Sequence, residues 1–108
     1  DKDHIPVLWV GNKGGSAKLL AGTSGPDMIE LWRWEMKPTE SYESSGHPKG
    51  TFELFHVEHG ELTLIIDGHE IVLYEGQSAV ARTDVPHSYE NKSKSNLVFT
   101  MTVAELKR

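Results

Sequence analysis

The sequence predicts an all-β domain, either a sandwich or a barrel. Helical periodicity is almost absent, and alternation of apolar and polar residues with a period of two recurs along the chain. Gly, Pro, Asn and Asp interrupt this alternation at intervals of about 8–12 residues, which is typical of short strands joined by turns. The length of 108 residues is that of one ordinary domain. We therefore expect a single domain over residues 1–108, without an internal repeat or a linker.

Turn residues divide the chain into the expected strands. Pro38 ends one of them, because proline cannot donate to a sheet ladder, and a polar connection at 39–50 follows it. Asp67-Gly68 predicts a two-residue hairpin, because both central residues of a type I′ turn take positive φ. In chain order, strands are expected at 7–10, 16–21, 28–37, 51–57, 62–66, 71–74 and 78–81, around His87 and Tyr89, and at 97–103.

Alternation within the strands indicates which side chains point inward. In the strand 28–37, one face carries Met28, Glu30, Trp32, Trp34 and Met36. Between 47 and 57, one parity carries His47, Lys49, Thr51, Glu53, Phe55 and Val57. Because Phe55 and Val57 are apolar, we expect this second face to point into the interior. By contrast, His56, His59 and His69 are expected to be exposed.

Composition excludes several classes of function. The chain has no cysteine, which rules out disulfides, thiolate metal sites and cysteine nucleophiles. It has no apolar run near the ~20 residues that cross a bilayer, so no membrane partner is expected. The formal net charge is −5, and 91–94 is the only dense basic stretch, so this domain is expected to bind DNA poorly. The sequence begins without Met, and we expect it to be part of a longer chain.

Two motifs carry a resemblance to a known family. In the first, Glu53 is followed by six residues and then Gly60, and His47 precedes it, but Lys49 stands where a second His belongs. In the second, Pro86 precedes His87, and Asn91 lies four residues after His87. The second motif opens at Gly76, and the stretch between the motifs contains the Asp67-Gly68 hairpin. The chain from Gly46 to Val103 therefore resembles a cupin.

The resemblance implies a small cupin, that is, a double-stranded β-helix or jelly-roll barrel with its core at about 40–104. A narrower similarity covers the runs 29–34, 47–53, 57–62 and 84–91. These runs resemble the C-terminal cupin of XRE-type helix-turn-helix transcription regulators. That resemblance implies a cytoplasmic sensor whose DNA contacts belong to a separate N-terminal helix-turn-helix domain, which these residues do not contain.

Cupin geometry would bring His47, Glu53 and His87 together. Two histidines and one carboxylate form a facial triad that suits divalent Fe, Mn, Ni or Zn and leaves open positions. Lys49 on the same face would compete with a cation for the carboxylate of Glu53. Bound metal and a metal-free polar pocket therefore both remain open.

In the metal-free alternative, the pocket binds a small metabolite. Lys49 would pair with Glu53 or with a ligand carboxylate, and His47, Arg82 and Tyr89 would be further donors. The ligand would then be anionic or zwitterionic, for example amino-acid-like. The expected apolar lining is Trp32, Trp34, Met36, Phe55, Leu64, Phe99 and Met101, each of which could equally be plain core.

Three functions follow from these alternatives. We favour an effector-sensing domain of a transcription regulator. A small metal-dependent enzyme, a dioxygenase or isomerase, would use His47, Glu53 and His87 as ligands and Tyr89 as an acid. The Lys at position 49 counts against that enzyme, and no catalytic residue is assigned. A stand-alone binding protein is the third. A homodimer through the edge strand 7–10 is also expected.

Overall fold

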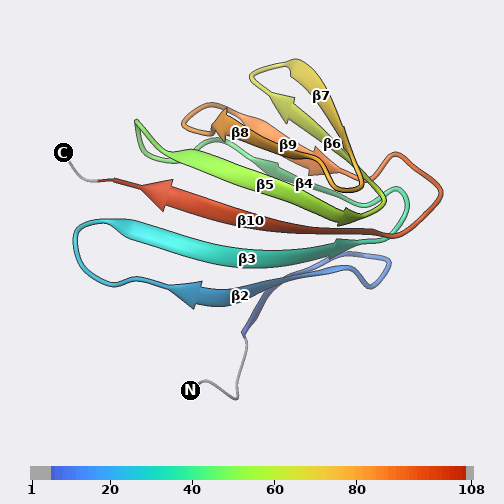
Figure 1. Cartoon of the computed structure of the whole chain (residues 1–108), viewed down its shortest axis with the longest axis horizontal. Coiled ribbons are helices and arrows are strands. Elements are labelled where there is room, and N and C mark those ends of the chain that lie inside the picture. The colour runs from blue at the N-terminus through green and yellow to red at the C-terminus, as the bar shows by residue number, and fades with distance from the viewer. Residues whose placement is uncertain (1–5, 107–108) are drawn as a thin grey trace.

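The structure is a computed structural model that describes residues 6–106. Over that range the chain forms ten strands and no helix, arranged in two antiparallel sheets (Figure 1). The all-β prediction is therefore confirmed. The strands are β1 (Val7–Val10), β2 (Ser16–Gly22), β3 (Met28–Met36), β4 (Ser41–Ser44), β5 (Phe52–His59), β6 (Glu61–Ile66), β7 (His69–Tyr74), β8 (Ser78–Arg82), β9 (His87–Glu90) and β10 (Leu97–Glu105).

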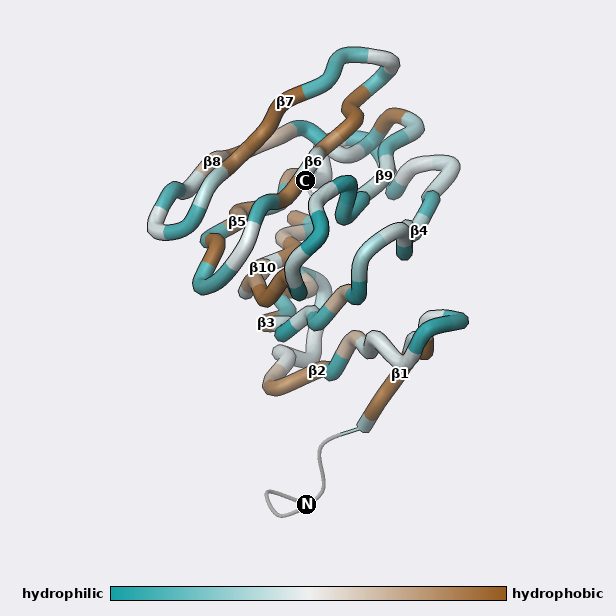
Figure 2. Tube along the Cα trace, turned by 90° about the vertical axis from the view of Figure 1, so that its right-hand side faces the viewer, coloured by the Kyte–Doolittle hydropathy of each residue, from teal (hydrophilic) through white to brown (hydrophobic). Residues whose placement is uncertain are grey.

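The two sheets enclose one apolar core, as in a jelly roll. One sheet has the order β1-β2-β3-β10-β5-β8, and the other has the order β4-β9-β6-β7. Figure 2 shows apolar segments along β10, β5 and β7, hydrophilic stretches in the connections, and β1 as an apolar segment at the edge. The fully buried side chains of the core include Met36, Val57, Leu62, Leu64, Leu97 and Phe99.

Alternation in β3 and β10 sets the two faces of the larger sheet. In β3, Trp34 and Met36 are buried, whereas Ile29 and Leu31 are each 41% exposed on the opposite face. The same period buries every second residue of β10 from Leu97 to Val103. The predicted alternation of the strand 28–37 is therefore confirmed.

Strand register aligns the inward residues of β3, β10 and β5 in rows across the sheet. The first row joins Glu30, Val103 and Glu53, and the second joins Trp32, Met101 and Phe55. Because opposite residues in neighbouring strands share a face, the row with two glutamates lies beside a row that carries aromatic side chains. This register positions the site described below.

The hairpin prediction is confirmed, and one strand was missed. Asp67 and Gly68 have φ values of 48° and 82°, as a type I′ turn requires. However, the expected polar connection at 39–50 contains β4, which pairs with β9. The sequence Ser-Tyr-Glu-Ser has a single apolar residue, so its alternation is too weak to predict a strand.

A buried glutamate joins two loops near one end of the six-stranded sheet. Glu40 is 2% exposed, and its carboxylate accepts hydrogen bonds from the backbone N–H groups of Lys37 (2.7 Å), Lys13 (2.7 Å) and Gly15 (3.2 Å). A Cβ atom at Gly11 would lie 2.0 Å from Oε2 of Glu40, and one at Gly15 would lie 2.1 Å from Oε1. The loop after β1 thus needs glycine at both positions to close over the carboxylate.

The environment of Glu40 favours the ionised carboxylate. Burial alone would raise its pKa, but the three backbone hydrogen bonds and the charge of Lys37 outweigh burial and lower the pKa below its ordinary value of 4.5. Glu40 is therefore a charged structural group that is held by backbone donors.

Residues 6–106 include no helix of the length and apolar character needed to cross a membrane.

Candidate metal centre and ligand cavity

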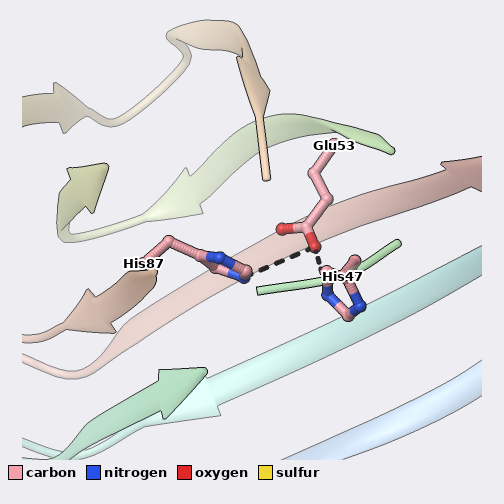
Figure 3. A group of neighbouring side chains, drawn as sticks. All are labelled: His47, Glu53 and His87. Atoms are coloured by element: carbon pink, nitrogen blue, oxygen red, sulfur yellow. Dashed lines mark ion pairs between the residues drawn. The ribbon is translucent and has the colours of Figure 1, made fainter. Parts of the chain in front are cut away.

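Three side chains from distant segments converge inside the barrel. His47 lies in the connection between β4 and β5, Glu53 lies on β5, and His87 begins β9. Oε2 of Glu53 is 3.0 Å from Nε2 of His47 and 3.7 Å from Nε2 of His87 (Figure 3). One ligand atom from each residue falls within 4.8 Å of the others, which is a spacing that allows all three to contact a single ion.

Glu53 is fully buried, and a tyrosine orients it. The side chain is 0% exposed, and the hydroxyl of Tyr89 donates a short hydrogen bond to Oε1. Burial, followed by the charge of Glu53 and this hydrogen bond, raises the pKa of Tyr89 well above 10.0. Tyr89 therefore remains a hydrogen-bond donor at neutral pH and fixes one oxygen of the carboxylate, so that the other oxygen faces the histidines.

The backbone selects the tautomer of His87. Its Nδ1 lies 2.8 Å from the carbonyl oxygen of Val85, and the side chain is fully buried. Because a carbonyl can only accept, Nδ1 carries a proton, and Nε2 is the ring nitrogen that faces Glu53. A backbone carbonyl behind the ligating imidazole is the usual outer partner of a metal-bound histidine.

Two buried atoms of this group have no hydrogen-bond partner among the described residues. They are Oε2 of Glu53, which nevertheless forms an ion pair with Nε2 of His47 at 3.0 Å, and Nε2 of His87. A buried polar atom that lacks a hydrogen bond costs roughly 1–3 kcal/mol. A divalent cation would satisfy both, so the residues present fit a metal ion.

His47 is the most accessible member of the group. Its side chain is 30% exposed, and its backbone N–H donates to the carbonyl of Thr83 at 2.9 Å, which anchors the loop. The Glu53 carboxylate raises the pKa of His47 above 6.5, against the effect of burial, and the charges of Glu105 and Glu30 add to the increase. His47 thus closes the solvent side of the site.

The structure does not place Lys49 and Arg82 in the site, which corrects their expected positions. Lys49 is exposed in the turn after Pro48 and forms no ion pair with Glu53. The parity rule holds only in extended chain, and Gly50, with φ of 88°, interrupts it. Arg82 is 67% exposed and pairs with Asp84 at 2.8 Å on the outside. The predicted competition between Lys49 and a metal is therefore absent.

A cavity of about 110 Å³ opens beside the candidate metal ligands. All three tryptophans of the chain line it, at positions 9, 32 and 34. Trp34 is 4% exposed, and its indole Nε1 also lacks a partner among the described residues. The lining consists of Leu8, Trp9, Ala17, Glu30, Trp32, Trp34, Tyr42, His47, Glu53, Tyr89, Met101 and Val103.

The sequence predicted part of this lining. Trp32, Trp34 and Met101 line the cavity as expected, whereas Met36, Phe55, Leu64 and Phe99 are core residues. Tyr42 was missed with its strand. Nothing in the sequence pattern indicated that Trp9 lines the cavity, because its strand has only four residues. Glu30 could have been found, since it shares the face of Trp32 and Trp34.

A larger hollow of about 490 Å³ lies on the opposite, outer face of the six-stranded sheet. It is open and contains no residue of the His47–Glu53–His87 group. Leu31, Leu54 and Val80 contribute exposed apolar side chains to it. We therefore locate the candidate site at the smaller inner cavity, where the titratable side chains converge.

Comparison with known proteins identifies the class. The family model for the cupin domain matches residues 32–103. This range covers most of the chain and includes all three candidate ligands, so the chain belongs to the cupin family. A search of curated proteins gives no match.

Solved structures include regulator domains with the same fold. The cupin domain of an XRE family transcriptional regulator from Enterobacter cloacae is 29% identical, with a TM-score of 0.69, over 73% of this chain and 83% of that one. An HTH_3 family transcriptional regulator from Vibrio cholerae is 22% identical, with a TM-score of 0.70, over 84% of this chain and 52% of that one. The present chain thus corresponds to about half of the Vibrio protein.

The same fold also occurs in a different functional class. A predicted oxalate decarboxylase from Thermotoga maritima is 19% identical, with a TM-score of 0.68, over 98% of this chain and 97% of that one. At this identity the similarity concerns the fold alone, and the choice between functions depends on the site.

Proposed function

We propose that this chain is the effector-sensing cupin domain of a helix-turn-helix transcription regulator. The observation that carries the proposal is the similarity to the Enterobacter regulator domain, at 29% identity over 83% of that chain. The inner cavity supports it, because it combines apolar walls with a few convergent polar groups, as ligand sites do. The proposal implies a cytoplasmic protein that contacts DNA through a separate domain.

The sensing step would be a shift between two arrangements of the full protein. A small molecule in the cavity can favour one arrangement only if it binds that arrangement more tightly. With a net charge of −5, this domain does not itself supply a basic surface for the phosphate backbone. Its role would be to change the spacing of paired DNA-binding domains.

The full-length protein tests this function. DNA fragments retained by the purified full chain are sequenced, and a discrete set of sites with two spaced half-sites is expected. An upstream coding segment for a helix-turn-helix domain is expected as well. Absence of such a segment, or retention of DNA without sequence preference, would refute the sensor proposal.

We also propose that His47, Glu53 and His87 bind a divalent metal ion. The convergence of the three ligand atoms within 4.8 Å and the unpartnered Nε2 of His87 support this. When bound, the metal would supply Lewis-acid chemistry and open coordination positions for a ligand oxygen or nitrogen. Elemental analysis of the purified chain is expected to show about one equivalent of metal. Loading with Zn²⁺ or Mn²⁺ that stays well below one equivalent would contradict it.

A metal-dependent cupin enzyme is the second candidate function. The two-histidine, one-carboxylate set favours it, because this set with open positions is typical of non-haem iron oxygenases. Tyr89 is poorly suited to act as a general acid, because burial and the charge of Glu53 raise its pKa. Iron in the protein isolated from its own host, together with oxygen uptake by the isolated chain, would favour the enzyme over the sensor.

We further propose a homodimer that pairs through β1. Among the described residues, β1 pairs only with β2. Val7, Leu8 and Val10 are 46%, 59% and 70% exposed, and the strand carries no charge. An apolar, uncharged edge lacks the usual protection against pairing with a second strand. A second copy of β1, antiparallel across a two-fold axis, would satisfy this edge.

Size-exclusion chromatography with light scattering tests the dimer. Wild type is expected at twice the chain mass, and Leu8→Lys is expected to shift the population to monomer. Leu54→Lys, on the outer face of the six-stranded sheet, is the matched control and should remain dimeric. A dimer lost with Leu54→Lys but retained with Leu8→Lys would place the interface elsewhere.

A further inference from the structure

The charges around the inner cavity are negative. Glu30 and Glu53 both line it, and no Lys or Arg is present among the described residues of its wall. Lys49 and Arg82, the two cations expected to bind a ligand carboxylate, lie outside it. An anionic ligand would therefore meet no basic side chain here except His47.

Aromatic rings form much of the remaining wall. The ring centroids of Trp9 and Trp34 are 5.4 Å apart and those of Trp34 and Tyr42 are 5.1 Å apart, with interplanar angles of 40° and 58°. Trp9 and Tyr42 meet edge to face at 82°, with centroids 6.3 Å apart. These packed rings line the cavity together. The faces of such rings carry negative electrostatic potential and attract cations.

Glu30 is not needed for the metal. On the strand register, Val103 separates Glu30 from Glu53, so the two glutamates lie two strand spacings, or about 10 Å, apart. Oε1 of Glu30 accepts a hydrogen bond from Nε1 of Trp32 at 3.2 Å. No described Lys, Arg or His forms an ion pair with it. Its charge remains available beside the aromatic wall.

An unpartnered buried atom indicates that the cavity is a binding site and not loosely packed core. Nε1 of Trp34 belongs to a residue that lines the cavity, is at least nine-tenths buried and lacks a hydrogen-bond partner among the described residues. Native cores rarely leave such atoms unpaired. A bound metal would not account for the indole N–H, which is a donor and needs an acceptor on the ligand, such as a hydroxyl oxygen, beside any cationic group.

We propose that the cavity binds a small organic ammonium ion, with its cationic head against Trp9, Trp32 and Trp34 and beside Glu30. The inference names the ligand class of the proposed sensor site and takes its biological meaning from that function. The cavity of about 110 Å³ is far below the ~300–1,000 Å³ of pockets that enclose drug-sized ligands. The ligand is therefore a compact head group, and any longer chain extends through the mouth.

Binding of choline, with matched probes, tests the charge preference. The uncharged isostere 3,3-dimethylbutan-1-ol has the same shape, and propionate supplies an anion. Intrinsic fluorescence reports directly on the cavity, because all three tryptophans line it. Choline is expected to bind at least about tenfold more tightly than the isostere in metal-free protein, where no metal charge offsets Glu30 and Glu53. Equal affinity for the isostere, or tighter binding of propionate, would overturn the inference.

Variants locate the binding site. Glu30→Gln is expected to weaken choline binding about fivefold, and Trp32→Leu about tenfold. Trp32→Phe keeps an aromatic face and should retain most of the affinity, which separates loss of the ring from a folding defect. Glu35→Gln is the matched control on the outward face of β3 and should bind as wild type. Choline affinity that none of the cavity variants changes would exclude this site.

The two proposals can fail separately. If the full protein shows no specific DNA binding but the chain still prefers choline to its isostere, the sensor function fails and the ammonium site stands. If the full protein binds specific DNA and the chain prefers the isostere or propionate, only the ammonium inference fails.

Discussion

Two buried glutamates of this protein have opposite environments. Glu40 is 2% exposed and Glu53 is 0% exposed, yet three backbone N–H groups saturate the first carboxylate. The second accepts a hydrogen bond from the Tyr89 hydroxyl on one oxygen, and its other oxygen lies 3.0 Å from Nε2 of His47 and 3.7 Å from Nε2 of His87. The first carboxylate is held by backbone donors, and the second by side chains of the candidate metal group. This difference separates a structural group from a binding group more clearly than burial does.

The comparison predicts that neutralising Glu40 causes the larger loss of stability. Glu40→Gln places an amide NH₂ against backbone donors and leaves at least one of them unsatisfied. The free energy of unfolding is expected to fall by about 3 kcal/mol in urea denaturation. The exposed Glu43→Gln serves as the control and should change it by less than about 0.5 kcal/mol. A Glu40→Gln variant as stable as this control would remove the structural role.

Glu53→Gln is expected to change binding instead of folding. The affinity for Zn²⁺ or Mn²⁺ should fall by about 100-fold or more, because a charged ligand is lost. The metal-free variant should unfold within about 1 kcal/mol of wild type, since it no longer buries an incompletely paired charge. Isothermal titration gives the first quantity and urea denaturation the second. A destabilisation equal to that of Glu40→Gln, with metal affinity retained, would reverse the assignment of the two roles.

Low pH is expected to remove the contribution of Glu40 to the free energy of unfolding. Its pKa in the folded protein is lowered below 4.5, so folding favours the ionised form. The stabilisation is complete above the unfolded value and is lost as pH falls through the folded one. Urea denaturation of wild type and Glu40→Gln should therefore give free energies that converge below pH 4.5. A constant difference from pH 7 down to the acid limit would contradict this linkage.

The smallest expected effect concerns Lys49. The first motif of the family carries a second histidine at this position, but here the side chain is exposed in a turn. Lys49→His is therefore expected to leave the affinity for Zn²⁺ within about twofold of wild type. Titration of both proteins under the same conditions measures it. A clear gain in affinity would mean that the turn can bring this side chain to the metal ligands.

Much of the fold could be predicted from local patterns. The alternation of β3, the presence of β10 and the Asp67-Gly68 turn are properties of short segments, and they were predicted correctly. β4 could not be predicted, because a strand of four mostly polar residues is stabilised by its partner and not by its own pattern. The contacts of Glu40 could not be predicted from the sequence either, since they depend on two loops that meet only in the folded chain.

The candidate site was predicted in part for similar reasons. The spacing of the motifs and the family resemblance correctly grouped His47, Glu53 and His87. Lys49 and Arg82 were misplaced: one follows a break in the extended chain, and the other lies on the outward parity of β8 next to exposed Val80. Parity identifies a face only within one uninterrupted strand.

The position of β1 has one more consequence. This strand contributes Leu8 and Trp9 to the cavity wall, while Val7 and Val10 are exposed along the free margin of the sheet. Occupancy of the cavity and association of two copies would therefore act on the same four residues. Thermodynamic reciprocity then requires that any factor by which association tightens ligand binding equals the factor by which ligand tightens association.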